Sequence, residues 1–289
     1  MADIADELDR SGVIGSSLVF QAYVRLSGSG PFQAGDYELR RGLGVKDSIA
    51  VLEDGPVITY EELRVPPGLW LSEIAERVEE QLPGRSAARF LEVAASGRVR
   101  SRYQPDGEQG LEGLLWPDTY RFVETDDETA VLRTMVREFD RRAGRLGLDA
   151  PAGGLSAYQT LIVASLVQSE AKVDSDRSLI ASVIMNRLEQ DMPLQIDATV
   201  LYAIGERKIS NTADDRATES PYNTYLVRGL PPTPISSVAE VSIEAALNPA
   251  ESEYLFYVVA DAEGRHAFAE TYDEHLVNVE AAREKGLLG

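Results

Sequence analysis

Glu170 is the residue of this sequence best placed for chemistry, because it ends the most apolar stretch of the chain. The preceding residues 161–167 (LIVASLV) predict a helix that is buried nearly all round. Burial disfavours a charged carboxylate, and so does the partial negative charge at a helix C-terminus, so both effects raise the pKa of Glu170. Such a group can act as a general acid near neutral pH. Alternatively, Glu170 lies just past the buried turn, where it is solvated or pairs with Lys172 or Arg177.

The composition leaves few other kinds of chemistry. The sequence has no cysteine and two histidines, His266 and His275, which are too few for a thiolate site or a histidine-rich metal site. Neither a Ser-His-Asp triad nor a phosphate-binding Walker loop has its local signature. We therefore expect carboxylate chemistry with no metal and no cofactor. We expect His266 to be a strand residue with a polar partner rather than a metal ligand.

The charge and hydropathy of the chain exclude some kinds of partner. The 289 residues include 48 acidic and 28 basic side chains, which gives a formal net charge of -20. Such a surface repels phosphates, and no Lys/Arg-rich run is present, so we expect no binding to nucleic acid. We find no run of eighteen apolar residues and no signal-peptide pattern, which predicts a soluble chain.

Capping boxes mark the helices that would position the catalytic group. Ser156 and Gln159 open the helix that leads to Glu170, and the next helix is expected over residues 175–189. Two further capping boxes, at residues 237–240 and 271–274, predict later helices. Between them, residues 254–260 and 266–269 flank a turn and predict a β-hairpin. The expected fold class is therefore α+β, with a helical catalytic domain that carries a β-hairpin.

The N-terminal part contains a repeat at an offset of seventy residues. Residues 3–6 (DIAD) match residues 73–76 (EIAE), and Phe20 matches Phe90, in a pattern of two short amphipathic helices. A strand at residues 58–60 is expected to lead into the second copy, whereas the first copy has no lead-in; a chance match is the alternative.

A turn signal at residues 105–107 (PDG) marks a further boundary. The sequence thus predicts three parts. They are an N-terminal α+β unit over residues 1–58, a small α+β unit over residues 59–106 and the catalytic domain over residues 107–289.

Six blocks of the sequence resemble the YceG-like endolytic murein transglycosylases. They are residues 111–120 (LEGLLWPDTY), 166–170 (LVQSE), 180–188 (IASVIMNRL), 194–202 (LQIDATVLY), 220–225 (SPYNTY) and 229–235 (GLPPTPI). Their order and spacing fit the family, and the likeness covers nearly the whole chain. Two positions depart from the family pattern. Ala171 stands where threonine is usual, and Gln168 where a second glutamate is common, which puts assistance from those positions in doubt.

The resemblance implies that Glu170 is the catalytic residue of a lytic transglycosylase. Such an enzyme cleaves the MurNAc–GlcNAc β-1,4 bond of peptidoglycan without water. Glu170 would protonate the leaving GlcNAc oxygen and then deprotonate the C6 hydroxyl of MurNAc, which attacks to give a 1,6-anhydro end. Ordinary glycosidases need a second carboxylate, whereas an intramolecular attack profits from proximity. Cleavage of nascent strands would terminate glycan elongation.

Contacts to the glycan are expected from the other blocks. A loop with stacking faces and amide donors contains Tyr222, Asn223 and Tyr225. Further polar groups stand in apolar or aromatic sequence, namely Gln195, Asp197, Glu112, Asp118 and Tyr120. For Asp197 and Asp118, capping and turn hydrogen bonds are an equal alternative.

The resemblance also implies an architecture and a location. Residues 59–106 would form a LysM-like unit that holds glycan, with an interdomain spacer as the alternative. The family is anchored in the cytoplasmic membrane by one N-terminal helix that this chain lacks, and the rest lies outside the cytoplasm. Peptidoglycan glycan strands are the implied substrate, and peptidoglycan synthases are possible partners.

Two other functions fit part of the pattern. A hydrolytic muramidase would use Glu170 with Asp197 or Asp174 and a water molecule. A non-catalytic protein that binds cell-wall glycan would need no carboxylate at the end of a buried helix.

Overall fold

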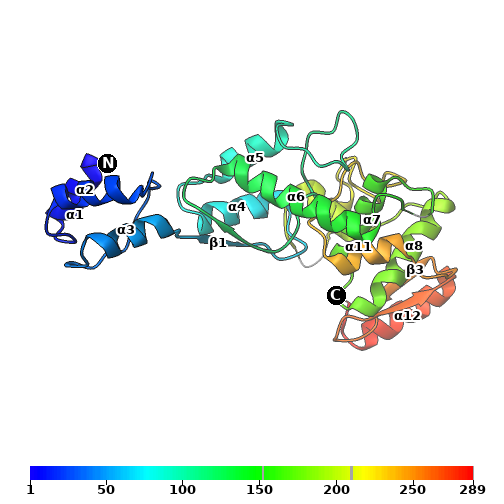
Figure 1. Cartoon of the computed structure of the whole chain (residues 1–289). Coiled ribbons are helices and arrows are strands. Elements are labelled where there is room, and N and C mark those ends of the chain that lie inside the picture. Colours follow the sequence, from blue (N-terminus) through cyan, green and yellow to red (C-terminus); the bar gives the residue numbers. More distant parts are fainter. Residues whose placement is uncertain (152, 209–210, 289) are drawn as a thin grey trace. The chain divides into compact units, whose positions relative to one another are not determined.

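The computed structural model describes residues 1–151, 153–208 and 211–288 of the chain. It divides into two compact units, Met1–Tyr60 and Glu61–Gly289 (Figure 1). Helices dominate, and the described residues form two small antiparallel sheets of two strands each. The predicted α+β class is therefore confirmed.

The first unit is helical. Its helices are α1 (Ala2–Arg10), α2 (Ser17–Ser27) and α3 (Val45–Asp54). They bury a small apolar core that includes Ala5, Phe20 and Ile49. The Ser16 hydroxyl caps α2 by accepting the backbone N–H of Val19.

The predicted repeat appears in the second unit at the expected offset. Helices α4 (Leu71–Gln81) and α5 (Ala87–Ala95) follow the pattern of α1 and α2. Phe90 is completely buried, like Phe20, and Ser86 caps α5 as Ser16 caps α2. The sequence match therefore corresponds to two helix pairs with the same local construction.

A two-stranded sheet flanks this second helix pair. Strand β1 (Glu61–Arg64) pairs antiparallel with β2 (Thr119–Phe122), so that the order is β-α-α-β. The strand begins three residues after the predicted one, and it buries Leu63 completely. Because β2 follows residue 106, the predicted boundary there falls between the two paired strands, and that boundary stays a prediction.

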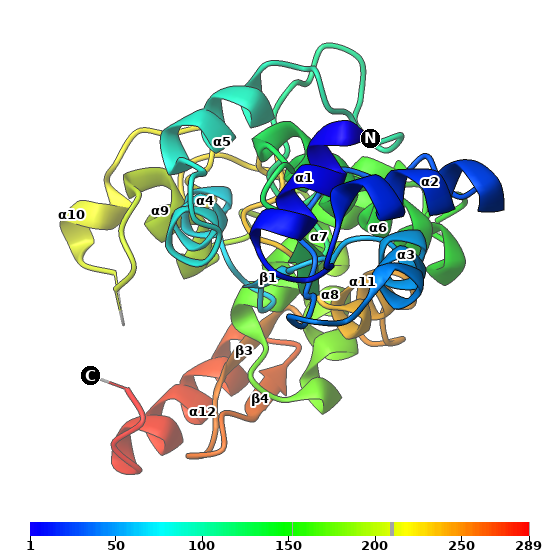
Figure 2. The same cartoon turned by 60° about the vertical axis from the view of Figure 1, so that its left-hand side comes forward.

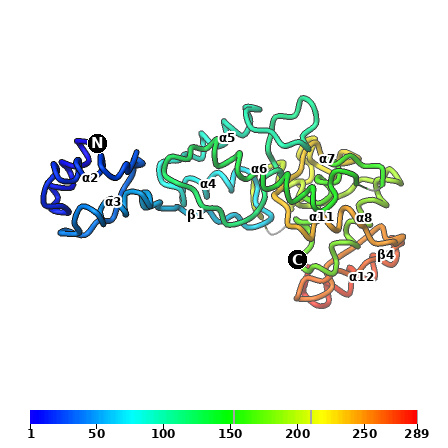
Figure 3. The backbone as a smooth tube through the Cα atoms, viewed as in Figure 1, coloured from blue at the N-terminus to red at the C-terminus, as the bar shows by residue number. Residues whose placement is uncertain are grey.

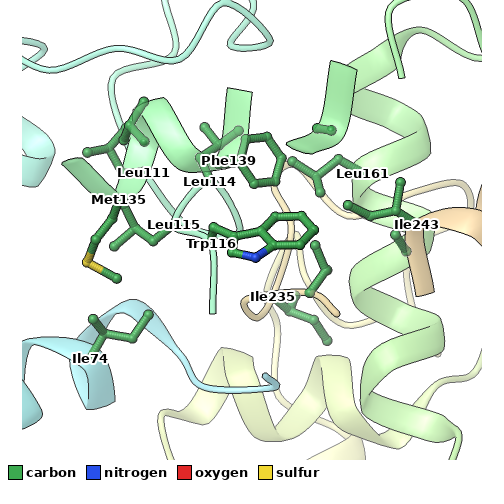
Figure 4. Packing of buried hydrophobic residues seen from close by; sticks show 14 of the residues in the cluster. Ile74, Leu111, Leu114, Leu115, Trp116, Met135, Phe139, Leu161, Ile235 and Ile243 are labelled. Atoms are coloured by element: carbon green, nitrogen blue, oxygen red, sulfur yellow. The ribbon is translucent and has the colours of Figure 1, made fainter. Parts of the chain in front are cut away.

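One apolar core runs through the second unit. The long helix α6 (Glu128–Leu146) contributes Met135 and Phe139 to it, and Phe139 contacts Trp116 from the preceding loop (Figure 4). The rings of Trp116 and Phe139 are 6.3 Å apart. Leu161 from the next helix lies at the same core. This core therefore fixes the next helix, which carries Glu170.

The helix that carries Glu170 is α7 (Ala157–Glu170). It is followed by the 3₁₀ turn η1 (Asp174–Asp176), α8 (Arg177–Glu189), α9 (Asp197–Ile204), α10 (Ala213–Arg216) and α11 (Glu240–Leu247). The capping box at Ser156 and Gln159 is present as predicted. The one predicted at residues 237–240 is wrong, because α11 follows Ala239 and has no side-chain cap. The Ser237 hydroxyl instead accepts the backbone N–H of Leu69.

The C-terminal part forms a separate layer of the second unit. Strands β3 (Phe256–Val259) and β4 (His266–Ala269) make the predicted hairpin, and α12 (Tyr272–Glu284) packs on it (Figure 2). The chain path shows this segment, in orange and red, beside α8 (Figure 3). Among the described helices, none has the length and apolar character needed to cross a membrane.

Candidate active site

Glu170 is the last residue of α7 and is half-buried between two clefts. The run of buried residues in α7 continues to Val167, so the helix enters the site from the core. The larger cleft has a volume of about 560 Å³, and the smaller one about 200 Å³; Glu170 lines both. The same carboxyl group is therefore accessible from two sides.

Burial and three neighbouring groups set the protonation of Glu170. Burial, the largest effect, raises its pKa to about 7. The Tyr257 hydroxyl donates a hydrogen bond of 2.9 Å to Oε2 and acts in the opposite direction. The charge of Asp197 raises the pKa, and the backbone N–H of Ala198 lowers it. The net result is a carboxyl group that can both give and take a proton near neutral pH.

Tyr257 is held in place by the hairpin. Its ring meets the edge of the His266 ring at 5.3 Å, from the neighbouring strand. His266 Nδ1 lies 3.0 Å from Asp176 Oδ2, which also accepts the His266 backbone N–H at 2.7 Å. His266 is thus a strand residue with a polar partner, as predicted. Burial raises the pKa of Tyr257 well above its ordinary value, so its hydroxyl stays a donor.

The hairpin with Tyr257 forms one wall of the larger cleft. The other wall contains three residues that were predicted from the sequence to contact the glycan, namely Gln195, Asp197 and Tyr225. The Tyr225 hydroxyl donates to Asp197 Oδ1 at 2.5 Å, and Arg216 Nε lies 3.7 Å from the same oxygen. Gln195 has a positive φ of 52°, an unusual backbone conformation for a residue with a side chain. Asp197 is the first residue of α9 and does not cap it.

Arg187 of α8 joins the two walls. Its guanidinium donates to the carbonyl oxygens of Leu255, at 2.7 Å, and Leu194, at 2.6 Å. It also lies 5.3 Å from the centre of the Phe256 ring. Burial lowers the pKa of Arg187, but an arginine keeps its charge in proteins. The segments that precede α9 and β3 therefore both accept hydrogen bonds from the Arg187 guanidinium, a cation that lines the cleft.

Asn223 and Tyr222 do not line either cleft. Asn223 is completely buried and donates to the carbonyl oxygens of Arg216 and Thr218. Its Oδ1 accepts the backbone N–H of Tyr225 at 3.0 Å, so it holds the loop that presents Tyr225. The Tyr222 hydroxyl is 2.9 Å from that of Thr233.

Glu112, Asp118 and Tyr120 also lie outside both clefts. Glu112 accepts the backbone N–H of Leu71 at 3.0 Å and the hydroxyl of Tyr202 at 3.1 Å. Burial raises the pKa of Glu112 to about 7. The structure thus uses this carboxyl group as a buried link between α4 and α9.

The other two residues stabilise the region of β2. Asp118 accepts a hydrogen bond of 2.9 Å from Arg142. The Tyr120 hydroxyl donates to the carbonyl oxygen of Trp116 at 2.6 Å. Asp118 also accepts the backbone N–H of Thr119 at 2.8 Å, a local turn hydrogen bond of the kind that the sequence left open for this residue.

Gln168, one of the departures from the family pattern, faces α11. Its Oε1 accepts the backbone N–H of Ala239 at 3.0 Å and the Ser242 hydroxyl at 2.8 Å. It lines neither cleft, so the amide serves helix packing.

The sequence did not single out several residues that line the larger cleft. They are Arg187, Arg216, Phe256, Tyr257, Tyr272 and His275. Arg187 stands within a block that resembles the family, and Tyr257 within the predicted hairpin. The others carry no local signal that would have identified them.

Comparisons with known proteins agree on one family. A family model described as the YceG-like family matches residues 1–281. The endolytic murein transglycosylase of Bacillus subtilis (strain 168) is 32% identical over 286 residues, which cover 94% of this chain and 79% of that protein.

Two further comparisons extend this result. The endolytic murein transglycosylase of Streptococcus pneumoniae serotype 2 is 28% identical over 311 residues, with 96% of this chain and 55% of that protein covered. The crystal structure of a YceG-like protein from Listeria monocytogenes matches with a TM-score of 0.67 and 32% identity. It covers 96% of this chain and 94% of that one.

Proposed function

The chain belongs to the YceG-like family, and from this premise we propose that it is an endolytic lytic transglycosylase acting on peptidoglycan strands. The observation that carries the proposal is Glu170, a half-buried carboxyl group with a pKa of about 7 that opens onto two clefts. The names of the relatives supply the class of reaction.

The proposed reaction uses Glu170 twice. Its protonated form gives a proton to the oxygen that leaves with GlcNAc, while the bond from that oxygen to C1 of MurNAc breaks. The resulting carboxylate then takes the proton of the MurNAc C6 hydroxyl, whose oxygen bonds to C1 and forms the 1,6-anhydro ring. Glu170 ends protonated again, and no water is consumed. A pKa near 7 suits both steps.

Tyr257 supports this double role. Its hydrogen bond occupies Oε2 of Glu170, which leaves Oε1 as the oxygen for proton transfer to the substrate. The same bond stabilises the carboxylate that forms after the first step. Tyr257 is therefore a positioning residue for the catalytic acid.

The second carboxylate of the larger cleft favours this mechanism over hydrolysis. A hydrolase would need Asp174 or Asp197 to act as nucleophile or to activate water, and of these two only Asp197 lines a cleft. Its Oδ1 already accepts from Tyr225 and lies near the Arg216 guanidinium. Both contacts engage this oxygen, so it is not free to attack C1 or to take a proton from water.

The two clefts support cleavage within a strand. A chain cut at an internal bond must continue on both sides of the catalytic acid. Glu170 lines both clefts, whose volumes differ by more than a factor of two. We propose that they hold the sugars on opposite sides of the scissile bond.

The remaining parts of the family pattern extend the proposal. The β-α-α-β order of β1, α4, α5 and β2 supports a LysM-like unit that holds glycan. On the same premise, we propose an extracytoplasmic protein that terminates growing strands beside peptidoglycan synthases.

Product analysis in H₂¹⁸O tests the reaction. The enzyme would digest uncrosslinked glycan strands, and the new ends would be examined by mass spectrometry. We expect ends that are lighter than a reducing end by one water and that contain no ¹⁸O. Reducing ends labelled with ¹⁸O would identify a hydrolase, and unchanged strands would identify a glycan-binding protein.

A further inference from the structure

Tyr272 stands exposed at the edge of the larger cleft. It is the first residue of α12, and 59% of its surface is accessible, although it lines the cleft that contains Glu170. In the described part of the chain, its hydroxyl has no hydrogen-bond partner. The fold therefore makes little use of this side chain.

Tyr272 belongs to an aromatic wall of the cleft. Its ring lies 5.8 Å from that of Phe256 and 6.2 Å from that of His275. The Phe256 and His275 rings are stacked at 5.3 Å, and the Arg187 guanidinium contacts Phe256. These contacts fix Phe256 and His275, so Tyr272 extends a rigid surface toward solvent.

The other wall of the same cleft is polar. Gln195, Asp197 and Arg216 line it, with amide, carboxylate and guanidinium groups. A cleft with an aromatic side and a hydrogen-bonding side suits a ligand that has one apolar face and polar edges. A pyranose ring has this form, because its C–H bonds lie on its faces and its hydroxyl and acetamido groups lie at its rim.

The imidazole of His275, on helix α12, adds no charge of its own to this aromatic wall. Burial lowers the pKa of His275, so that its ring is neutral near pH 7. Its Nδ1 is buried, and none of the described residues forms a hydrogen bond to it. A neutral imidazole stacked on Phe256 adds aromatic surface rather than a charge, which favours an uncharged sugar ring at this place.

We propose that Tyr272, with Phe256 and His275 packed behind it, forms a stacking platform for one pyranose ring of the glycan in the larger cleft. This inference rests on the proposed function, since the glycan is its ligand. The platform holds the strand at a position next to the reacting sugars, and it acts on substrate affinity rather than on proton transfer.

Glycan binding without cleavage tests the platform. The parent protein carries Glu170→Gln, and the probe is a tetrasaccharide of alternating GlcNAc and MurNAc, with the Kd measured by calorimetry. We expect Tyr272→Leu to weaken binding about tenfold, because a leucine loses the flat aromatic face. Tyr272→Phe keeps that face and should stay within about twofold of the parent.

A control on the same helix separates stacking from other effects. Val277 is 69% exposed and lines neither cleft, so Val277→Ala should leave the Kd unchanged. Thermal melting would show that each variant is folded.

The outcomes separate the two proposals. If Tyr272→Leu binds as tightly as the parent, or if Tyr272→Phe loses as much affinity as Tyr272→Leu, the platform is refuted and the proposed function stands. If the Glu170→Gln parent binds no glycan, the proposed function fails with it.

Discussion

At the scale of single residues, the site depends on opposing influences on one carboxyl group. Burial and the charge of Asp197 raise the pKa of Glu170, while the Tyr257 hydroxyl and the N–H of Ala198 lower it. A fully buried carboxyl group without donors would stay protonated and could not act as a base. Tyr257 therefore adjusts the balance between the acid and base roles that we propose for Glu170.

Removing the Tyr257 hydroxyl should shift the pH dependence of the reaction. That hydrogen bond stabilises the charged form of Glu170, so Tyr257→Phe raises its pKa further. The first step needs protonated Glu170, and activity falls as the pH rises through its pKa. The alkaline limb of kcat/KM should therefore move to higher pH, and kcat should fall about tenfold.

Tyr225→Phe is the matched control, because the hydroxyl it removes donates to Asp197 instead of Glu170. We expect a smaller shift of the alkaline limb in this variant. An unchanged limb in Tyr257→Phe, or equal shifts in both variants, would contradict the role given to Tyr257.

At the scale of elements, a buried carboxyl group joins two helices far apart in sequence. Glu112 accepts the N–H of Leu71, at the start of α4, and the hydroxyl of Tyr202 in α9. Helix α9 begins with Asp197 and the Ala198 N–H, which both act on Glu170. Glu112 thus stabilises the position of a helix that borders the active site without touching the cleft.

Replacing Glu112 by alanine should destabilise the second unit. The change leaves a half-buried N–H and a half-buried phenol without their acceptor, at a cost of roughly 2 kcal/mol. Unfolding in urea measures the loss. Glu92→Ala, at an exposed ion pair with Arg89, should cost less than about 0.5 kcal/mol. Similar losses in both variants would show that the link through Glu112 contributes little.

Only part of the site could be predicted from the sequence, because some of its features depend on neighbouring residues and others on distant ones. The cap at Ser156, the end of α7 at Glu170 and the hairpin depend on neighbouring residues, and the structure contains all three. The capping box at residues 237–240 failed because Ser237 contacts Leu69, which lies 168 residues away. A local pattern cannot indicate that a distant backbone group uses the same hydroxyl.

Contacts between residues far apart in the sequence also determine which polar side chains line the cleft. Tyr257 bonds Glu170 across 87 residues, and nothing near either residue predicts that contact. Asn223 and Tyr225 stand two positions apart in one block, yet the first is buried in the loop and the second lines the cleft. The residue types predicted that this block carries polar groups. The path of the backbone determines which of these side chains faces the cleft.

At the scale of the whole molecule, Glu170 and the two clefts that it lines belong to the second unit. The core of that unit includes residues from the β-α-α-β segment as well as from α6, α7 and α11. The first unit has its own small core. The fold class and the order of the helices followed from the sequence, whereas the extent of the shared core came from tertiary contacts.

The central claim is that one carboxyl group carries both proton transfers, and Glu170→Gln tests it most directly. The amide keeps the size of the side chain but cannot exchange the proton, so the variant should fold. Anhydro ends released from uncrosslinked glycan strands would be counted by mass spectrometry. The account predicts a rate lower by about 10⁴-fold, at the upper end for loss of general acid–base catalysis. Release of anhydro ends at the wild-type rate by the folded variant would contradict it.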